Sequence, residues 1–132
     1  MSDMDKNYDL WFPQKKQLNK RKKPPSFRER EIWWCHIGIN IGFEIFGKGK
    51  TVTRPILIIK KYSKYTFLAA PLSSREARFK NHIPIEFNGR QSIIRLDQLR
   101  TYDSRRLSGD ILERVPNKKF KEIKKILIDD FR

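Results

Sequence analysis

Two apolar segments of strand length, separated by a short polar link, constrain the fold of this chain most strongly. The apolar segments are residues 56–59 and 67–72, and residues 60–64 form the link between them. This pattern predicts two neighbouring antiparallel strands. In such a pair the start of one strand lies beside the end of its partner, so we expect Arg54 to lie close to Ser73. A fixed cation beside a hydroxyl, both held on rigid strands, suits phosphate chemistry.

The net charge of the chain indicates a polyanionic partner. Of the 132 residues, 30 are Lys or Arg and 15 are Asp or Glu, which gives a net charge of +15. Such an excess favours nucleic acid, an anionic membrane or an acidic protein as the partner. The length suits one domain with one core. No apolar run approaches membrane-spanning length, and the acidic start does not resemble a signal peptide, so we expect a cytoplasmic protein.

The sequence gives little support for metal or disulfide chemistry. Cys35 is the single cysteine, so the chain has no intrachain disulfide, which fits a reducing compartment. The two histidines, His36 and His82, have no Cys or His near them at zinc-ligand spacing. We therefore expect neither a metal site nor a cofactor.

The composition divides the chain into residues 1–28, a basic and flexible tail, and residues 29–132, one folded domain. The tail is rich in Lys and Arg and contains Pro24 and Pro25, so it lacks the apolar surface needed to fold alone. An aromatic cluster at residues 8–12 is the exception. This cluster is either exposed in the tail or an anchor that docks on the domain or on RNA.

The folded part is expected to contain five or six short strands and a C-terminal helix. Asn88-Gly89 predicts a tight hairpin, and Phe120, Ile123 and Leu127 recur at helical spacing. The expected strands are residues 31–37, 56–59, 67–72, 82–87, 91–96 and 109–115; short helical turns are expected within residues 97–103 and 104–107, and the helix from residue 116 or 117.

The first of these strands carries large apolar side chains on both faces, which indicates burial on both faces, as in a small closed barrel. Trp33 and Trp34 point to opposite faces because side chains alternate along a strand. We expect Trp34 in the core and Trp33 free to stack on bases. The predicted fold class is therefore mainly β with a C-terminal α-helix, arranged as a small SH3-like barrel.

Five blocks of sequence, taken in order, resemble the MazF/PemK family, the toxin halves of type II toxin–antitoxin modules. The most distinctive block, residues 96–107, begins Leu-Asp-Gln-Leu-Arg-Thr, and the resemblance covers about residues 30–128. The other four blocks are Glu31-Ile32-Trp33-Trp34, Gly42-Phe43-Glu44, Arg54-Pro55-Ile56-Leu57-Ile58-Ile59 and Pro71-Leu72-Ser73-Ser74.

The resemblance implies a MazF/PemK/CcdB-like barrel that forms a homodimer. It also implies an endoribonuclease that cuts single-stranded mRNA without a metal, leaves a 2′,3′-cyclic phosphate and so inhibits translation. An acidic antitoxin of the MazE/PemI kind is the implied protein partner.

The resemblance further implies which residues carry the chemistry. Arg54 and Ser73 match the arginine and threonine that act in the family, and Ser74 is the alternative hydroxyl if the alignment shifts by one residue. A guanidinium binds two phosphate oxygens and is a poor base, so Arg54 is expected to stabilise the phosphorane. Serine in place of threonine keeps the hydroxyl but loses the methyl group that restricts χ1.

The general base stays open between Glu44 and His82, with His36 as a weaker candidate. Glu44 is placed with the catalytic residues, although the loop between it and Arg54 is longer than in compact family members. The residues expected to bind RNA are Phe43, Lys48, Lys50, Ser74, Arg75 and His82, with Trp33, Phe46 and Phe79 as further aromatic side chains that can stack on bases.

Two other functions remain open. In the related CcdB-type toxins the same barrel binds and poisons DNA gyrase without performing chemistry. A barrel that binds RNA but has lost nuclease activity is the second alternative. The pairing of Arg54 with Ser73 favours the nuclease, because a gyrase poison does not need it.

Overall fold

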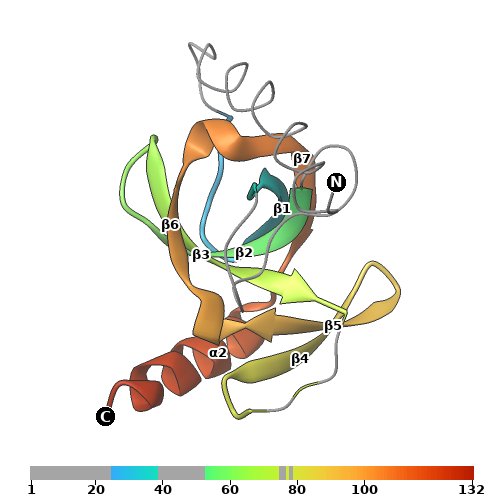
Figure 1. The fold of residues 1–132 in the computed structure, drawn as a ribbon, viewed down its shortest axis with the longest axis vertical. Helices are drawn as coiled ribbons and strands as arrows, with labels where there is room; N and C mark the ends of the chain where they lie inside the picture. Colours follow the sequence, from blue (N-terminus) through green and yellow to red (C-terminus); the bar gives the residue numbers. More distant parts are fainter. Residues whose placement is uncertain (1–24, 39–52, 75–76, 78) are drawn as a thin grey trace, which may run out of the picture.

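A rolled seven-stranded sheet and one C-terminal helix make up the computed structural model, which describes residues 25–38, 53–74, 77 and 79–132 (Figure 1). The predicted class, mainly β with a C-terminal helix, is confirmed. The elements are β1 (Glu31–His36), β2 (Thr53–Lys61), β3 (Thr66–Ser73), β4 (His82–Phe87), β5 (Arg90–Arg95), the 3-10 turn η1 (Leu96–Gln98), β6 (Arg100–Asp103), the 3-10 turn η2 (Ser104–Arg106), β7 (Leu107–Arg114) and α2 (Asn117–Asp130).

Strand β3 connects the parts of the sheet. Along one edge it pairs with β2, as the two apolar segments predict. Along the other edge it pairs first with β6, at Thr66–Ala69, and then with β5, at Leu72 and Ser73. The strand order is β4-β5-β3-β2-β1-β7, with every pair antiparallel. Because β3 changes partner halfway along, the sheet folds over into a half-barrel.

The strands at the centre of the sheet bury both of their faces, as predicted. One face of β1, β2 and β3 packs with α2, through residues such as Ile32, Leu57 and Ile123. The opposite face forms a second cluster inside the barrel, which includes Trp33 and Phe67. The alternation of side chains along each strand supplies both clusters from the same short segments.

The packed region begins earlier than the predicted domain boundary. Phe27 belongs to the segment predicted as a tail, yet it is 1% exposed, and its ring centroid lies 5.1 Å from that of Phe67. Lys61 donates from Nζ to the carbonyl oxygen of Phe27, and its backbone N–H donates to Oε2 of Glu29, both at 2.9 Å. The chain is therefore tied to β2 from residue 27 onward. Residues 1–24 lie outside the described part, so the tail itself stays a prediction.

The local differences from the sequence analysis have simple physical reasons. The short helical turns predicted within residues 97–103 and 104–107 correspond to η1 and η2. Strand β6, which lies between them, was not predicted, because its mixture of charged and apolar residues carries no strand pattern; it forms by pairing with the edge of β3. Asn88 and Gly89 both have positive φ angles, 53° and 75°, as the predicted tight hairpin requires. The helix begins at Asn117, with Pro116 in the N-cap position.

No helix in the described part of the chain is long and apolar enough to cross a membrane.

Candidate active site

A cavity of about 580 Å³ lies at the end of the sheet where β2 begins and β3 ends. Four parts of the chain form its walls: β1, the start of β2, the end of β3 and the β4–β5 hairpin. Their lining residues are Trp34; Thr53, Arg54 and Pro55; Leu72, Ser73 and Ser74; and Phe87, Asn88, Arg90, Gln91 and Ser92.

Strand pairing brings Arg54 and Ser73 to the same cavity, as the sequence predicts. Ile56 is the partner of Pro71 in the β2–β3 ladder, and Arg54 and Ser73 each lie two residues beyond that pair. The guanidinium of Arg54 donates from Nη1 to the carbonyl oxygen of Leu72 at 3.1 Å. Because Leu72 directly precedes Ser73, this hydrogen bond holds the cation beside the end of β3.

Ser73 and Ser74 lie in different surroundings. Ser73 is 6% exposed, and its pairing with Ile93 of β5 holds its backbone in place. Ser74 follows the end of β3 and is exposed. Both line the cavity. The better-positioned hydroxyl is that of Ser73, because its neighbours restrict where its side chain can lie.

The two adjacent tryptophans have the opposite places to those expected. Trp34 is 41% exposed and lines the cavity, whereas Trp33 is 5% exposed and lies in the second core. The buried indole Nε1 of Trp33 donates to Oε1 of Glu31 at 3.1 Å. The alternation of side chains along a strand shows that the two rings point to opposite faces of the sheet. It does not show which of the two faces is buried. The side chain available for stacking in this cavity is therefore Trp34.

The charge of the cavity favours an anion. Arg54 and Arg90 are among its lining residues, and none of the lining residues that the structure describes is Asp or Glu. Trp34 contributes an aromatic ring to the lining of the cavity, and Ser73 contributes a hydroxyl group. Cationic, aromatic and hydroxyl groups are the types that bind a single-stranded nucleic acid through its phosphates and bases.

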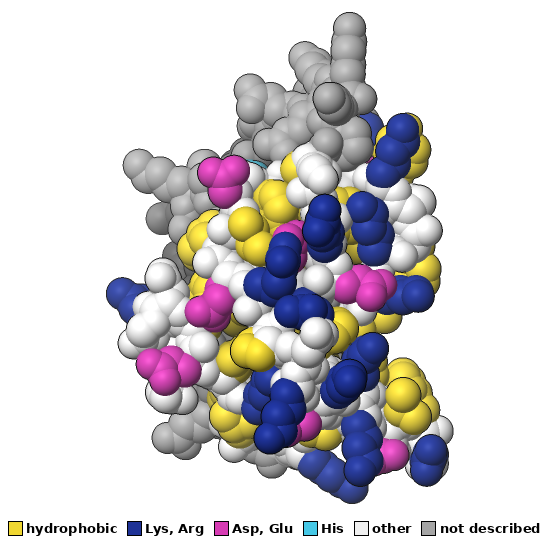
Figure 2. Space-filling view, turned by 180° about the vertical axis from the view of Figure 1, so that it is seen from behind, with side chains coloured by type: hydrophobic (Ala, Val, Ile, Leu, Met, Phe, Trp, Pro, Cys, Tyr) yellow, Lys and Arg dark blue, Asp and Glu magenta, His cyan; other side chains and the backbone are white. Residues whose placement is uncertain are grey.

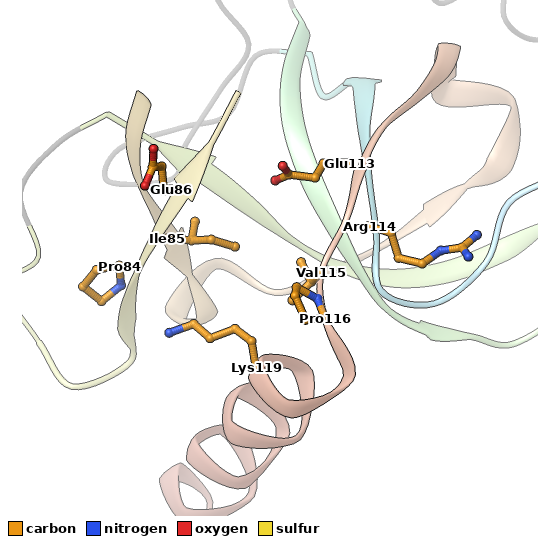
Figure 3. A pocket seen from close by; sticks show the side chains of 8 residues that line it. All are labelled: Pro84, Ile85, Glu86, Glu113, Arg114, Val115, Pro116 and Lys119. Carbon is orange, nitrogen blue, oxygen red and sulfur yellow. The ribbon is translucent and has the colours of Figure 1, made fainter. Parts of the chain in front are cut away.

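A second cavity, of about 420 Å³, differs in charge (Figure 3). Glu86 of β4 and Glu113 of β7 stand on opposite walls near one end, and Lys119 of α2 stands near the other. Arg114 also lines this cavity, so its two acids and two bases balance. This arrangement offers a phosphate less attraction than the cavity around Arg54.

His82 does not join the site. It is 6% exposed, its Nε2 lies 3.3 Å from Oδ1 of Asp97, and its ring packs edge-on against Phe79, with centroids 5.1 Å apart. Burial disfavours the charged form of Asp97, but the hydrogen bonds and charge of Arg95, together with the contact from His82, outweigh burial and hold the pKa of Asp97 below its usual range. The sequence analysis allowed His82 as a base and as an RNA ligand; the structure instead places it in a packed ion-pair cluster outside the cavity.

The remaining predicted residues fall into two groups. His36 is half-buried and absent from the lining of the cavity, and its carbonyl oxygen accepts from Arg106 Nη1 at 3.2 Å. Phe79 is 66% exposed and does not line the cavity either. Outside the described residues lie Phe43, Glu44, Phe46, Lys48, Lys50 and Arg75.

The sequence analysis missed the wall that the β4–β5 hairpin provides. Arg90, Gln91 and Ser92 follow the Asn-Gly turn, which was recognised, but nothing local indicates that this hairpin lies beside β3. The hairpin lies beside β3 because Ser73 pairs with Ile93, which is a contact between segments that are distant in the sequence. As a consequence of this position, the hairpin adds a second cation, Arg90, to the site.

Cys35 lies next to Trp34 but offers no nucleophile. It is fully buried, and burial raises the pKa of its thiol to about 12, so the reactive thiolate is scarce at neutral pH. Within the described ranges, no group of three or more His, Cys, Asp or Glu side chains is arranged to hold a metal ion.

Comparison with known proteins identifies the family. Residues 28–130 match the family model described as PemK-like, MazF-like toxin of type II toxin–antitoxin system. No curated protein matches the chain in sequence.

Several solved structures share the fold at low sequence identity. MazF from Deinococcus radiodurans has a TM-score of 0.61 and 19% identity, with 83% of this chain and 98% of that chain covered. Mycobacterium tuberculosis toxin MazF-mt6 has a TM-score of 0.59 and 14% identity, covering 77% and 96%. A mycobacterial endoribonuclease, solved in complex with its cognate antitoxin, has a TM-score of 0.58 and 14% identity, covering 80% and 95%.

The family match spans most of the chain and all of the cavity residues, and the half-barrel with its C-terminal helix agrees with it. The chain therefore belongs to the PemK-like, MazF-like toxins of type II toxin–antitoxin systems.

Proposed function

We propose that this toxin is an endoribonuclease that cuts single-stranded mRNA in the cytoplasm and so inhibits translation. The observation that supports this most directly is the placement of Arg54 beside Ser73 in a cavity with a second arginine, Arg90, and no described acidic lining residue. The mycobacterial structure of the same fold, which is described as an endoribonuclease, supports the same activity.

The reaction uses the RNA's own 2′-hydroxyl group. The 2′-oxygen loses its proton and attacks the neighbouring phosphorus, the bond from phosphorus to the 5′-oxygen breaks, and that oxygen takes up a proton. The products are a 2′,3′-cyclic phosphate and a 5′-hydroxyl. Between them lies a crowded anionic phosphorane, and stabilising its charge is the main demand on the protein.

Arg54 meets this demand in the proposed mechanism. Its Nη1 donates to the carbonyl oxygen of Leu72, which holds the guanidinium at the cavity, and a guanidinium presents its N–H donors in a planar fork that matches phosphate oxygens. The hydroxyl of Ser73 donates to a phosphate oxygen, and the ring of Trp34 stacks on a base beside the scissile bond. Of the bases predicted from the sequence, Glu44 is the one we retain, because His82 is buried against Asp97.

The positive surface suits a long polyanionic substrate. Lys and Arg side chains gather on the face seen in Figure 2, most densely over the part where α2 lies. Within α2, five of the residues are lysines, Lys118, Lys119, Lys121, Lys124 and Lys125. We expect RNA affinity to fall steeply as salt rises, because each phosphate contact releases counterions.

A cleavage assay with purified protein tests the proposal. Incubation with a mixed-sequence single-stranded RNA should give discrete fragments with 5′-hydroxyl ends and 2′,3′-cyclic phosphates, in the presence of EDTA as well as in its absence. Sequencing of the new 5′ ends then defines the cleavage motif. Intact RNA after incubation with a folded protein, or activity that EDTA abolishes, would contradict the proposed mechanism.

We also propose two protein partners: a second copy of the chain and an acidic antitoxin. Two of the similar structures contain an antitoxin, the mycobacterial complex and MazE–MazF from Deinococcus radiodurans. The net charge of +15 favours rapid association with an acidic segment. Expression of the toxin alone should slow growth of the host cells. Co-expression of a neighbouring gene that encodes a small acidic protein should restore their growth. Sedimentation should give twice the mass of the chain.

A further inference from the structure

The turn between β2 and β3, residues 60–65, exposes two tyrosines among lysines. Tyr62 is 58% exposed and Tyr65 51% exposed, and Lys60 and Lys64 are exposed beside them. A two-strand turn needs only polar or flexible residues, so the fold gains little from large aromatic rings in solvent at this point. Residues 60–65 form the hairpin tip.

Backbone contacts hold the hairpin tip in place. Ser104, which is 0% exposed, donates from Oγ to the carbonyl oxygen of Lys64 and from its backbone N–H to that of Tyr65, both at 2.8 Å. The N–H of Tyr62 donates to the carbonyl oxygen of Thr66 at 3.1 Å. Turn η2, from a distant part of the chain, therefore fixes the backbone that carries Tyr65, and the hydrogen bond to Thr66 fixes the backbone that carries Tyr62. A surface fixed in advance loses less entropy when a ligand binds.

The tip combines stacking surface with positive charge. Nζ of Lys64 lies over the Tyr65 ring, 5.1 Å from its centroid, so a charge that attracts phosphate lies at one face of a ring that is half exposed and can stack on a base. The neighbouring acid, Asp103, accepts two hydrogen bonds from the guanidinium of Arg105 at 2.9 and 2.8 Å, which offsets its charge. Aromatic rings interspersed with cations are what proteins use to bind single strands without sequence preference.

We propose that the hairpin tip is a second binding site for single-stranded RNA, which holds the strand at a distance from the cavity where it is cut. Bases stack on Tyr62 and Tyr65, and phosphates lie near Lys60 and Lys64. This inference rests on the proposed function, because it takes the same RNA as the ligand. Two exposed rings placed between lysines match the stacking and phosphate contacts of a single-stranded RNA. The lysines would also attract an acidic protein segment, and measurement of antitoxin binding separates the two ligands.

The distance between the two sites determines which RNAs use both. Strand β2 carries Arg54 near its start and leads to the hairpin tip at its end, so at about 3.3 Å per residue the two are about 25 Å apart. In Figure 1 the β2–β3 turn projects at the upper left, whereas the β4–β5 hairpin, which lines the cavity, lies on the right. A short RNA that fills the cavity alone cannot reach the tip; an RNA with a single-stranded flank can.

Binding of uncleavable RNA tests the proposal independently of catalysis. We would measure the Kd of two 2′-O-methyl RNAs, one short and one with the same core and an extended flank. The Tyr62→Ala/Tyr65→Ala variant should bind the extended RNA about ten-fold or more weakly, since loss of a stacked base typically has an effect of this size. Its affinity for the short RNA should not change. The Tyr62→Phe/Tyr65→Phe variant should bind both RNAs like the wild type, because phenyl rings still stack.

A charge-matched pair of variants separates the tip from general electrostatic attraction. Lys60→Ala/Lys64→Ala should weaken binding of the extended RNA more than Lys121→Ala/Lys125→Ala, which removes the same charge from the exposed face of α2. Equal losses in these two variants would overturn the proposal, as would wild-type affinity of the double alanine variant for the extended RNA. So would a tyrosine variant that binds RNA normally but loses the antitoxin. Failure of the wild type to cut any RNA would overturn the proposed function alone, because these binding measurements need no cleavage.

Discussion

Arg54 donates a hydrogen bond from Nη1 to the carbonyl oxygen of Leu72, 3.1 Å away on the neighbouring strand. This contact ties a cation at the start of β2 to the residue that precedes Ser73 at the end of β3. A side chain bound to the backbone in this way keeps its orientation in the free protein, so in the proposed mechanism little reorganisation is needed at the moment of reaction.

Replacement of Arg54 by alanine should abolish RNA cleavage and leave the fold intact. Arg54 is half-buried at a strand end rather than in a core cluster, so its truncation creates no core cavity. Loss of a fixed charge from the transition state typically costs about 3–4 kcal/mol, or a factor of hundreds in rate. Arg54→Lys should recover little, because an ammonium group cannot span two phosphate oxygens. Lys80→Ala, an equal loss of charge at an exposed residue that does not line the cavity, is the control, and the rate of RNA cleavage is the measurement; full activity in Arg54→Ala would refute the assignment.

Substitution at Ser73 should identify the acting hydroxyl. Ser73→Ala should lower the cleavage rate, whereas Ser73→Thr should be tolerated or faster, because a β-branched side chain restricts χ1 and keeps the hydroxyl in place. Ser74→Ala should have the smaller effect, since Ser74 is exposed beyond the end of β3. Single-turnover cleavage rates of the three variants make the comparison, and a larger loss in Ser74→Ala would transfer the role to that residue.

The adjacent tryptophans should separate binding from stability. Trp34→Ala should weaken RNA binding with little change in melting temperature, because Trp34 is 41% exposed in the cavity. Trp33→Ala should destabilise the fold by about 3–5 kcal/mol, the usual cost of truncating a buried aromatic side chain. Denaturant unfolding and RNA affinity, measured on both variants, should give these opposite patterns. The same stability loss in both would show that Trp34 is part of the packed core.

Glu31 should make the fold sensitive to acid. It is 5% exposed and accepts hydrogen bonds from the backbone N–H of Arg28, from Trp33 Nε1 and from Arg114 Nη2. Burial opposes ionisation, but these hydrogen bonds outweigh it and hold the pKa of Glu31 below its usual range. A carboxyl whose pKa is lower when folded stabilises the protein above its unfolded pKa, and this contribution is lost as the pH falls through the folded pKa.

Comparison of the wild type with Glu31→Gln tests this. The variant should unfold at lower denaturant concentration at neutral pH, and the difference should shrink below about pH 4, as Glu31 becomes protonated in the wild type. Glu122→Gln, on the exposed part of α2, serves as the control and should match the wild type throughout. A constant difference between wild type and Glu31→Gln across the pH range would mean that its charge has no part in stability.

The sequence was sufficient for those parts of the site that depend on local pattern. The two apolar segments predict the β2–β3 pair, and an antiparallel pair necessarily brings Arg54 toward Ser73. The Asn88-Gly89 turn predicts the β4–β5 hairpin for the same kind of reason. The position of that hairpin beside β3, and with it Arg90, depends on a contact between distant segments that no local pattern encodes.

The predictions that failed came from sequence patterns that are compatible with more than one structure. Alternation separates Trp33 from Trp34 but leaves open which face is covered more deeply, and the half-barrel leaves Trp34 at the cavity. Strand β6 has no apolar alternation of its own and forms because the edge of β3 is available to it. Phe27 follows two prolines in a basic segment that has no core pattern, and its place in the second core comes from contacts with distant residues such as Phe67 and Lys61.

The three partners of β3 have a consequence for synthesis of the protein. A ribosome makes Arg54 and Ser73 well before it makes β5 and β6, which complete the other edge of β3. Until those segments have emerged, one wall of the cavity and the rigid support of Ser73 are missing. A nascent or prematurely ended chain therefore carries Arg54 and Ser73 without the enclosure that orients them. In the proposed mechanism, the toxin then gains activity only after the ribosome has completed this part of the chain.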